Sequence, residues 1–172
     1  DRAYTPISLC TPARSSLLCG QYPHNHGAMW NAGCHMRFEE EWFGRDLHTY
    51  PQQLAQQGYR LAHFGKWHVG IARTGADLGF EGVAPRDYGN PFEQPEYHAY
   101  LEQRNLPMPE KVVEWSAHTP EPGDFGDNSS GFMTGSIEAA PCMFLAESTA
   151  DKISQYAEED TDKPWMAVCS FW

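Results

Sequence analysis

The spacing of apolar and polar residues along the chain indicates helices interspersed with short strands. Residues 147–159 show the clearest helical pattern, because apolar positions recur at helical spacing among acidic and polar neighbours. Short apolar runs at 59–64 and 165–172 are typical of strands, and the second is typical of a buried one. Helices combined with such strands predict an α/β layer architecture, in which ligands bind at the carboxyl ends of strands. The apolar positions of the helix are Ala150, Ile153, Tyr156 and Ala157.

Shorter helices are predicted where a capping residue and a stop signal enclose a segment. Residues 10–20 have Pro12 in the first turn and end at a glycine. Thr49 caps a second short helix, which ends at Gly58. Residues 96–104 form another predicted helix. Three segments rich in turn-forming residues are predicted to be mostly irregular: residues 21–46, 75–95 and 107–141.

Composition and charge narrow the function further. The chain has 172 residues, of which 41% are hydrophobic, and this fits one globular domain with a moderate core. Its net charge of −11 repels polyanions and argues against a nucleic-acid partner, so an anionic substrate needs a local cationic pocket. No apolar run approaches the roughly 18 residues of a membrane span, so no span is predicted in this segment.

The cysteines and histidines show no recognisable metal-binding spacing. Five cysteines without a close pair indicate neither a disulfide framework nor a zinc ribbon. His24 and His26 lack a third ligand at a recognisable spacing, so they are expected to order the loop beside a site rather than to bind zinc. His63 lies in a predicted strand and is expected to be a packed, hydrogen-bonded residue.

The first candidate site is Cys10-x-Pro12-x-Arg14 at a predicted helix start. A helix N-terminus offers unpaired N–H groups and positive potential to an anion. Arg14 is four residues after Cys10, so a helix places both on one face. The alternative is a small buried cysteine with Arg14 in a surface ion pair.

The second candidate site is the glycine-bounded segment 65–70, with the sequence GKWHVG. Lys66 and His68 project to the same side if the backbone is extended, and they would bring a cation and a proton-transfer group into one pocket. The alternative is a solvent-facing lysine and a histidine packed on Trp67. The flanking glycines favour a site, because they permit close backbone approach.

These two motifs, in this order, resemble those of the type I sulfatase family. The resemblance rests on CTPARSSLLCG at 10–20 and GKWHVG at 65–70, and extends to QYPHNHG at 21–27 and KPW at 163–165. It implies an alkaline-phosphatase-like α/β/α sandwich with a mostly parallel central sheet. The chain starts at Asp1 and stops inside an apolar run, so residues 1–172 are expected to be an N-terminal portion of that catalytic domain without its first strand and C-terminal part.

The resemblance also implies a role for each motif residue. Cys10 would be oxidised to Cα-formylglycine by a formylglycine-generating or anaerobic sulfatase-maturating enzyme, with Thr11 and Pro12 in the recognition signal. The hydrate, bound to Ca²⁺ or Mg²⁺, would attack the sulfur of a sulfate ester. Arg14 would hold the hydrate, and Lys66 would bind sulfate oxygens. His68, also assigned to substrate binding, would hydrogen-bond the hydrate and help to move the second proton. Cys10 is the only metal ligand implied within this chain, and the others would lie outside it.

The predicted function is therefore that of a sulfuric ester hydrolase that releases inorganic sulfate. The alternatives are a phosphonate or phosphodiester hydrolase of the same superfamily and a non-catalytic anion-binding α/β domain. The substrate is expected to be a small-molecule or carbohydrate sulfate ester, and the family favours a periplasmic, secreted or lysosomal location. Loop aromatics that could stack on sugar rings are Trp30, Trp42, Tyr88 and Trp115.

Overall fold

The computed structural model describes residues 2–31, 47–70, 73–85, 89–117, 128–159 and 162–171. Its helices are α1 (Cys10–Cys19), α2 (Pro23–His26), α3 (Tyr50–Gln56), α4 (Pro95–Gln103) and α5 (Pro141–Glu159). Its strands are β1 (Arg60–Gly65), β2 (Glu81–Val83), β3 (Lys111–Ala117), β4 (Asn128–Met133) and β5 (Trp165–Ser170). Short 3₁₀ turns are η1 (Gly75–Leu78), η2 (Pro91–Glu93) and η3 (Ile137–Ala139). Among these helices, none is long and apolar enough to cross a membrane.

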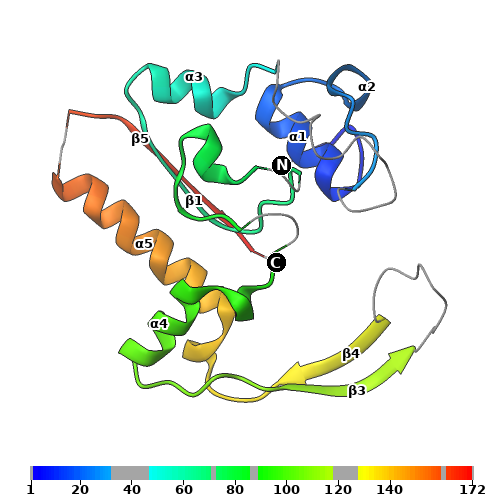
Figure 1. Cartoon of the computed structure of the whole chain (residues 1–172), viewed down its shortest axis with the longest axis vertical. Coiled ribbons are helices and arrows are strands. Elements are labelled where there is room, and N and C mark those ends of the chain that lie inside the picture. Colours follow the sequence, from blue (N-terminus) through cyan, green and yellow to red (C-terminus); the bar gives the residue numbers. More distant parts are fainter. Residues whose placement is uncertain are drawn as a thin grey trace.

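A parallel sheet with the strand order β2-β1-β5 lies between two layers of helices. Figure 1 shows α5 on one side of this sheet and α1 and α3 on the other. Side chains alternate along β1, so Ala62 and Phe64 pack on the α5 side, while Leu61 packs on the α1 side. The predicted mostly parallel sheet is therefore confirmed, with β1 at its centre.

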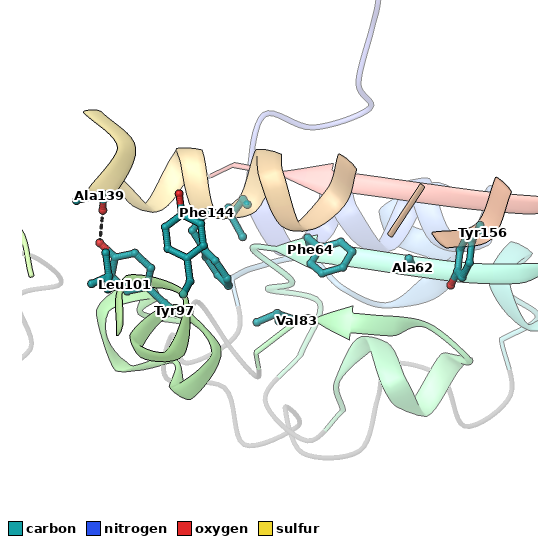
Figure 2. Close-up of a cluster of buried hydrophobic side chains, with 10 residues drawn as sticks. Ala62, Phe64, Val83, Tyr97, Leu101, Ala139, Phe144 and Tyr156 are labelled. Carbon is teal, nitrogen blue, oxygen red and sulfur yellow. Dashed lines mark hydrogen bonds between the residues drawn. The ribbon is translucent and has the colours of Figure 1, made fainter. Parts of the chain in front are cut away.

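The layer of α4 and α5 is held by stacked and edge-on aromatic rings. Tyr97 and Tyr100 of α4 contact Phe144 of α5 with ring centroids 5.5 and 5.3 Å apart. The hydroxyl of Tyr97 donates to the carbonyl of Ala139 (Figure 2), and that of Tyr156 donates to the carbonyl of Leu61 at 3.2 Å. Each buried phenol thus has a backbone acceptor, which removes the cost of burying it.

Several predicted elements are confirmed with small shifts. Strand β1, helix α1 and helix α4 lie within about a residue of the predicted bounds, as expected for strong local signals. Helix α5 begins at Pro141, six residues before the predicted start at 147. Its first turns bury Phe144 and Leu145 within a nearly continuous apolar run, in which the helical period is not visible.

The prediction that 107–141 is mostly irregular is wrong for its described residues, 107–117 and 128–141. Strands β3 and β4 pair as an antiparallel ribbon that extends away from the sheet (Figure 1). A register shift between Val113 and Trp115 interrupts the ladder, and the two consecutive valines in the sequence of β3 break the alternation of apolar and polar residues that marks a strand. The loop predicted at 75–95 also contains an exception, the three-residue edge strand β2. The loop predicted at 21–46 contains α2, and its residues 32–46 lie outside the described part.

Candidate active site

Helix α1 begins at Cys10 without a cap from its own N-cap residue. Leu9 supplies no side-chain hydrogen bond, but the side-chain oxygen of Asn31 accepts from the N–H of Thr11 at 3.0 Å. Gly20 ends the helix in the left-handed region, as predicted, and donates to Ser16 O at 2.8 Å. The residue after Cys10 is therefore held by a side chain twenty positions away.

The second motif follows β1 through a glycine that the packing requires. Gly65 has φ +101°, and a Cβ placed there would lie 2.0 Å from the carbonyl oxygen of Ser170. The N–H of Lys66 donates to that same oxygen at 2.9 Å. The segment does not stay extended, because His68 adopts φ +47°. The extended geometry assumed for Lys66 and His68 is thus wrong at His68.

The two motifs meet directly. The hydroxyl of Thr11 donates to the carbonyl of His68 at 3.0 Å. Lys66 is 7% exposed, and its Nζ lies 3.8 Å from the Sγ of Cys10, within hydrogen-bond distance for sulfur. The solvent-facing alternative for Lys66 is therefore excluded. His68 is also buried, at 4% exposure.

Arg14 contacts the second motif and the end of β5. Its Nη1 donates to Lys66 O at 2.9 Å and to the hydroxyl of Ser170 at 3.0 Å. A guanidinium held by a backbone carbonyl and a hydroxyl has a fixed orientation. Cys10 and Arg14 line the same cavity of about 900 Å³, as their spacing on one helix face predicts. The cavity is lined by residues 4–9, by α1 residues, by residues 20–22 and by Ser170. Lys66 and His68 are not among its lining residues.

Two buried histidines support this region without lining the cavity. His26 shares a hydrogen bond of 2.9 Å with Ser16 and accepts from the N–H of Ala28 through Nδ1, so the predicted role in ordering this loop is confirmed for it. Burial lowers the pKa of His26. His63 packs edge-on against Trp67 and Phe80. Burial, and then the charge of Arg14, lower the pKa of His63 to about 4.

Part of the predicted hydrogen bonding of His63 is absent. The Nδ1 of His63 is buried without a hydrogen-bond partner in the described part of the chain. The prediction that His63 is packed is therefore confirmed, and the predicted hydrogen bond is absent at Nδ1.

Among the described residues, no group of three His, Cys, Asp or Glu side chains gathers into a cation site. The four described cysteines, Cys10, Cys19, Cys142 and Cys169, are free thiols.

Some sequence predictions lie partly outside the described structure. Trp42 and Tyr88 are not among the described residues, and the side chain of Trp115 is not described. Trp30 is 60% exposed and directly precedes Asn31, which contacts the start of α1. Sequence reasoning missed Asn31 and Ser170, because each contacts α1 across a long stretch of chain.

Residues 1–171 match the family model described as Sulfatase. This chain belongs to the sulfatase family. The sulfatase chain is 39% identical to arylsulfatase A of Bos taurus over 75 residues, which make up 44% of this chain and 14% of that protein. It is 35% identical to N-acetylglucosamine-6-O-sulfatase of Bacteroides thetaiotaomicron over 69 residues, 40% of this chain and 11% of that protein.

The fold of this sulfatase chain also resembles a solved structure, the crystal structure of Ps i-CgsB in complex with k-i-k-neocarrahexaose. The TM-score is 0.59 at 16% sequence identity, over 98% of this chain and 35% of that one. The predicted alkaline-phosphatase-like α/β fold is thereby confirmed. The chain spans about a third of the length of this structure, and its alignments to the two relatives cover smaller shares of those proteins.

Proposed function

We propose that this chain carries part of the active centre of an enzyme that hydrolyses sulfate esters and releases inorganic sulfate. The observation that carries the proposal is the buried ammonium of Lys66, 3.8 Å from Cys10 Sγ and joined through its backbone to Arg14. Arg14 lines the cavity together with Cys10, and the Lys66 ammonium reaches the Cys10 side chain from outside the cavity lining. These two cations supply the local positive charge that an anionic substrate needs in a chain of net charge −11.

The position of Cys10 fits a Cα-formylglycine residue. The side chain is half-buried on the cavity wall at the start of α1, and a cation donates to its terminal atom. An oxygen there would accept a stronger hydrogen bond from Lys66 than sulfur does. Once formed, the aldehyde hydrate would attack the sulfur of the ester through one hydroxyl and displace the alcohol. Its second hydroxyl would then lose a proton, expel sulfate and restore the aldehyde, a route that an unmodified thiol does not offer.

The other motif residues bind and orient the reacting groups. Lys66 binds sulfate oxygens and stabilises the negative charge that develops on them. Arg14 orients the side chain of residue 10 and offsets its charge. His68, buried beside Thr11, contacts the substrate and transfers a proton. These roles extend the family resemblance onto the residues that the fold brings together.

The divalent cation implied by the family, Ca²⁺ or Mg²⁺, is not provided for by the described residues. Hard cations take about six oxygen ligands, whereas the described residues contain no cluster of three His, Cys, Asp or Glu side chains. Residue 10 alone does not make a cation site.

We further propose a carbohydrate sulfate as the substrate class. Support comes from the names of similar proteins, an N-acetylglucosamine-6-O-sulfatase and a structure in complex with a neocarrahexaose. Trp30 is an exposed ring next to Asn31, close in sequence to the contact with α1. An exposed indole in that place can stack on a sugar ring. Replacing Trp30 by Ala is expected to raise KM for a sulfated sugar and leave that for a small aryl sulfate unchanged.

The decisive experiment is a mass measurement combined with turnover on matched esters. The tryptic peptide from Ala3 to Arg14 of active protein is expected to be lighter than its thiol form and to react with hydrazines. Cys19, on the same helix, is the internal control and is expected to keep its thiol. An unmodified Cys10 in fully active protein would overturn the proposal.

The same preparation distinguishes the alternative functions. Catalytic efficiency is compared on aryl sulfate, phosphate diester and phosphonate esters with the same leaving group. The sulfate ester is expected to be preferred. A preference for either phosphorus ester would identify a phosphonate or phosphodiester hydrolase, and binding without turnover would identify an anion-binding domain. The maturating enzyme and an exported location stay predictions.

A further inference from the structure

We propose that Ser170, at the carboxyl end of β5, is a positioning residue that fixes Arg14 and Lys66 relative to residue 10. This inference rests on the proposed function and assigns a role to a residue outside both motifs. Ser170 lies 156 positions from Arg14 in sequence, yet its hydroxyl accepts from Arg14 Nη1 at 3.0 Å. No local pattern in the sequence indicates this contact.

Ser170 contacts both cationic residues through different atoms. Its hydroxyl oxygen accepts from Arg14, while its carbonyl oxygen accepts from the N–H of Lys66 at 2.9 Å. The carbonyl of Lys66 in turn accepts from Arg14 Nη1 at 2.9 Å. These contacts close a ring of hydrogen bonds through Arg14, Lys66 and Ser170. Because Nη1 carries two hydrogens, this ring uses both of them.

The ring fixes the guanidinium rather than merely burying it. A planar guanidinium held by two acceptors at one nitrogen cannot rotate about its long side chain without breaking a charge-assisted hydrogen bond. The backbone beneath it is equally constrained, since any Cβ at Gly65 would collide with Ser170 O. Arg14 therefore has one orientation on the cavity wall that it shares with residue 10, which is the condition for a preorganised site.

The hydroxyl of Ser170 is not needed to build the sheet. Strand β5 pairs with β1 from Arg60 opposite Trp165 to Gly65 opposite Ser170, and these contacts use backbone atoms. The side chain of Ser170 is half-buried and lines the cavity together with Cys10 and Arg14. Removing one oxygen atom from this wall leaves the ladder and the apolar core intact.

The test compares Ser170→Ala, Ser170→Thr and the unsubstituted protein in steady-state turnover of a sulfate ester. Ser170→Ala is expected to lower kcat about ten- to a hundredfold, the range for losing a hydrogen bond to a charged group, with KM changed less than about twofold. Ser170→Thr keeps the hydroxyl and suits a strand, so it is expected to restore most of kcat. Ser154→Ala, at an exposed position of α5, is the matched serine control.

A second measurement separates positioning from a general structural effect. In an Arg14→Ala background, adding Ser170→Ala is expected to reduce kcat no further, because the residue that Ser170 positions is already gone. Equal losses in both backgrounds, or full activity of Ser170→Ala, would overturn the inference and leave the proposed function standing. If the unsubstituted protein lacks both the aldehyde and sulfate release, the proposed function fails first, and this inference fails with it.

Discussion

The two faces of the central sheet are held by different forces. On the α5 face, Ala62 and Phe64 pack against a cluster of aromatic rings from α4 and α5 (Figure 2). On the α1 face, apolar contacts around Trp67 are accompanied by buried polar groups, including Thr11 and Lys66. Strand β1 thus lies between an apolar core on the α5 face and the buried polar groups of the candidate site on the α1 face.

The difference predicts how each face responds to substitution. Dispersion and burial have no direction, so the α5 face tolerates change that preserves volume. Hydrogen bonds to buried polar groups are directional, and losing one partner leaves the other unsatisfied. Changes near α1 are therefore expected to reduce activity more than they reduce stability, and changes near α5 to do the reverse.

The largest effect is expected for Cys10→Ala on the α1 face. Without the oxidisable side chain, turnover should fall on the order of a thousandfold or more, as it does when a nucleophile is removed. The free energy of unfolding should change by less than about 1 kcal/mol, because the side chain is small and half-buried. Steady-state kinetics and denaturant unfolding measure the two quantities. Cys19→Ala, on the same helix, should leave turnover unchanged, and an equal loss there would contradict the comparison.

The opposite behaviour is expected for Phe144→Ala on the α5 face. This ring is 3% exposed and contacts both Tyr97 and Tyr100. Its removal should lower the free energy of unfolding by about 3–5 kcal/mol through lost burial and a residual cavity. Turnover per folded molecule should stay near that of the unsubstituted protein. Phe132→Ala serves as the control, because Phe132 is 54% exposed and should change the stability little.

Local sequence patterns predicted the parts of the fold that depend on near neighbours. The Cys10 motif, the glycine-bounded motif and β1 are each readable within a dozen residues, because caps, glycines and apolar runs act locally. The β3–β4 ribbon was missed because the sequence KVVEWSA of β3 does not alternate strictly between apolar and polar residues. Its partner strand begins with Asn and Ser residues, which lack the β-branched pattern of a strand.

The candidate site was predictable only in its motif residues. Arg14 and Cys10 share a helix face by spacing alone, whereas Ser170 reaches Arg14 only once β5 pairs beside β1. Asn31 likewise contacts Thr11, twenty residues earlier, and no repeating pattern of apolar and polar residues predicts this contact. Contacts of this kind follow from the folded arrangement, so the residues that support the motifs could not be found from the sequence.

A third prediction concerns the charge of Lys66. Lys66→Ala should lower kcat about a hundred- to a thousandfold, as expected when a preorganised electrostatic contact to the transition state is lost. Lys66→Arg should restore little, because the planar guanidinium does not fit the place of a compact ammonium in a buried site. Lys152→Ala removes a lysine that pairs with Glu81 on the surface, and it should leave turnover unchanged. Substantial activity of Lys66→Ala would remove Lys66 from the mechanism.

A fourth prediction follows from the buried His63, which lies on the α1 face. Its pKa is about 4 in the folded protein against 6.5 in the unfolded chain, mainly because of burial. Above pH 6.5 both states are neutral and the full stability is present. As the pH falls from 6.5 to about 4, the unfolded chain takes up a proton that the folded protein does not, so stability is lost. The loss should be on the order of 2–3 kcal/mol.

His63→Leu is expected to remove this pH dependence. Unfolding free energies measured across that range should decline less steeply in the variant than in the unsubstituted protein. The matched control is His24→Leu at an exposed position, which should keep the original slope. If the unfolding free energy of His63→Leu depends on pH as steeply as that of the unsubstituted protein, another titratable group causes the loss of stability in acid.

The smallest effect is expected at Asn31, where two different substitutions should affect stability and activity separately. Asn31→Ala removes the acceptor of the Thr11 N–H and should lower the free energy of unfolding by about 1 kcal/mol, the usual cost of a lost helix cap. Asn31→Asp keeps an acceptor and adds a negative charge favourable to the helix N-terminus, so stability should recover. That same charge should repel a sulfate ester near Cys10 and raise KM. A variant that recovers stability and loses affinity would show that the α1 face is arranged for an anion rather than for packing, whereas recovery of both would remove that distinction between the two faces.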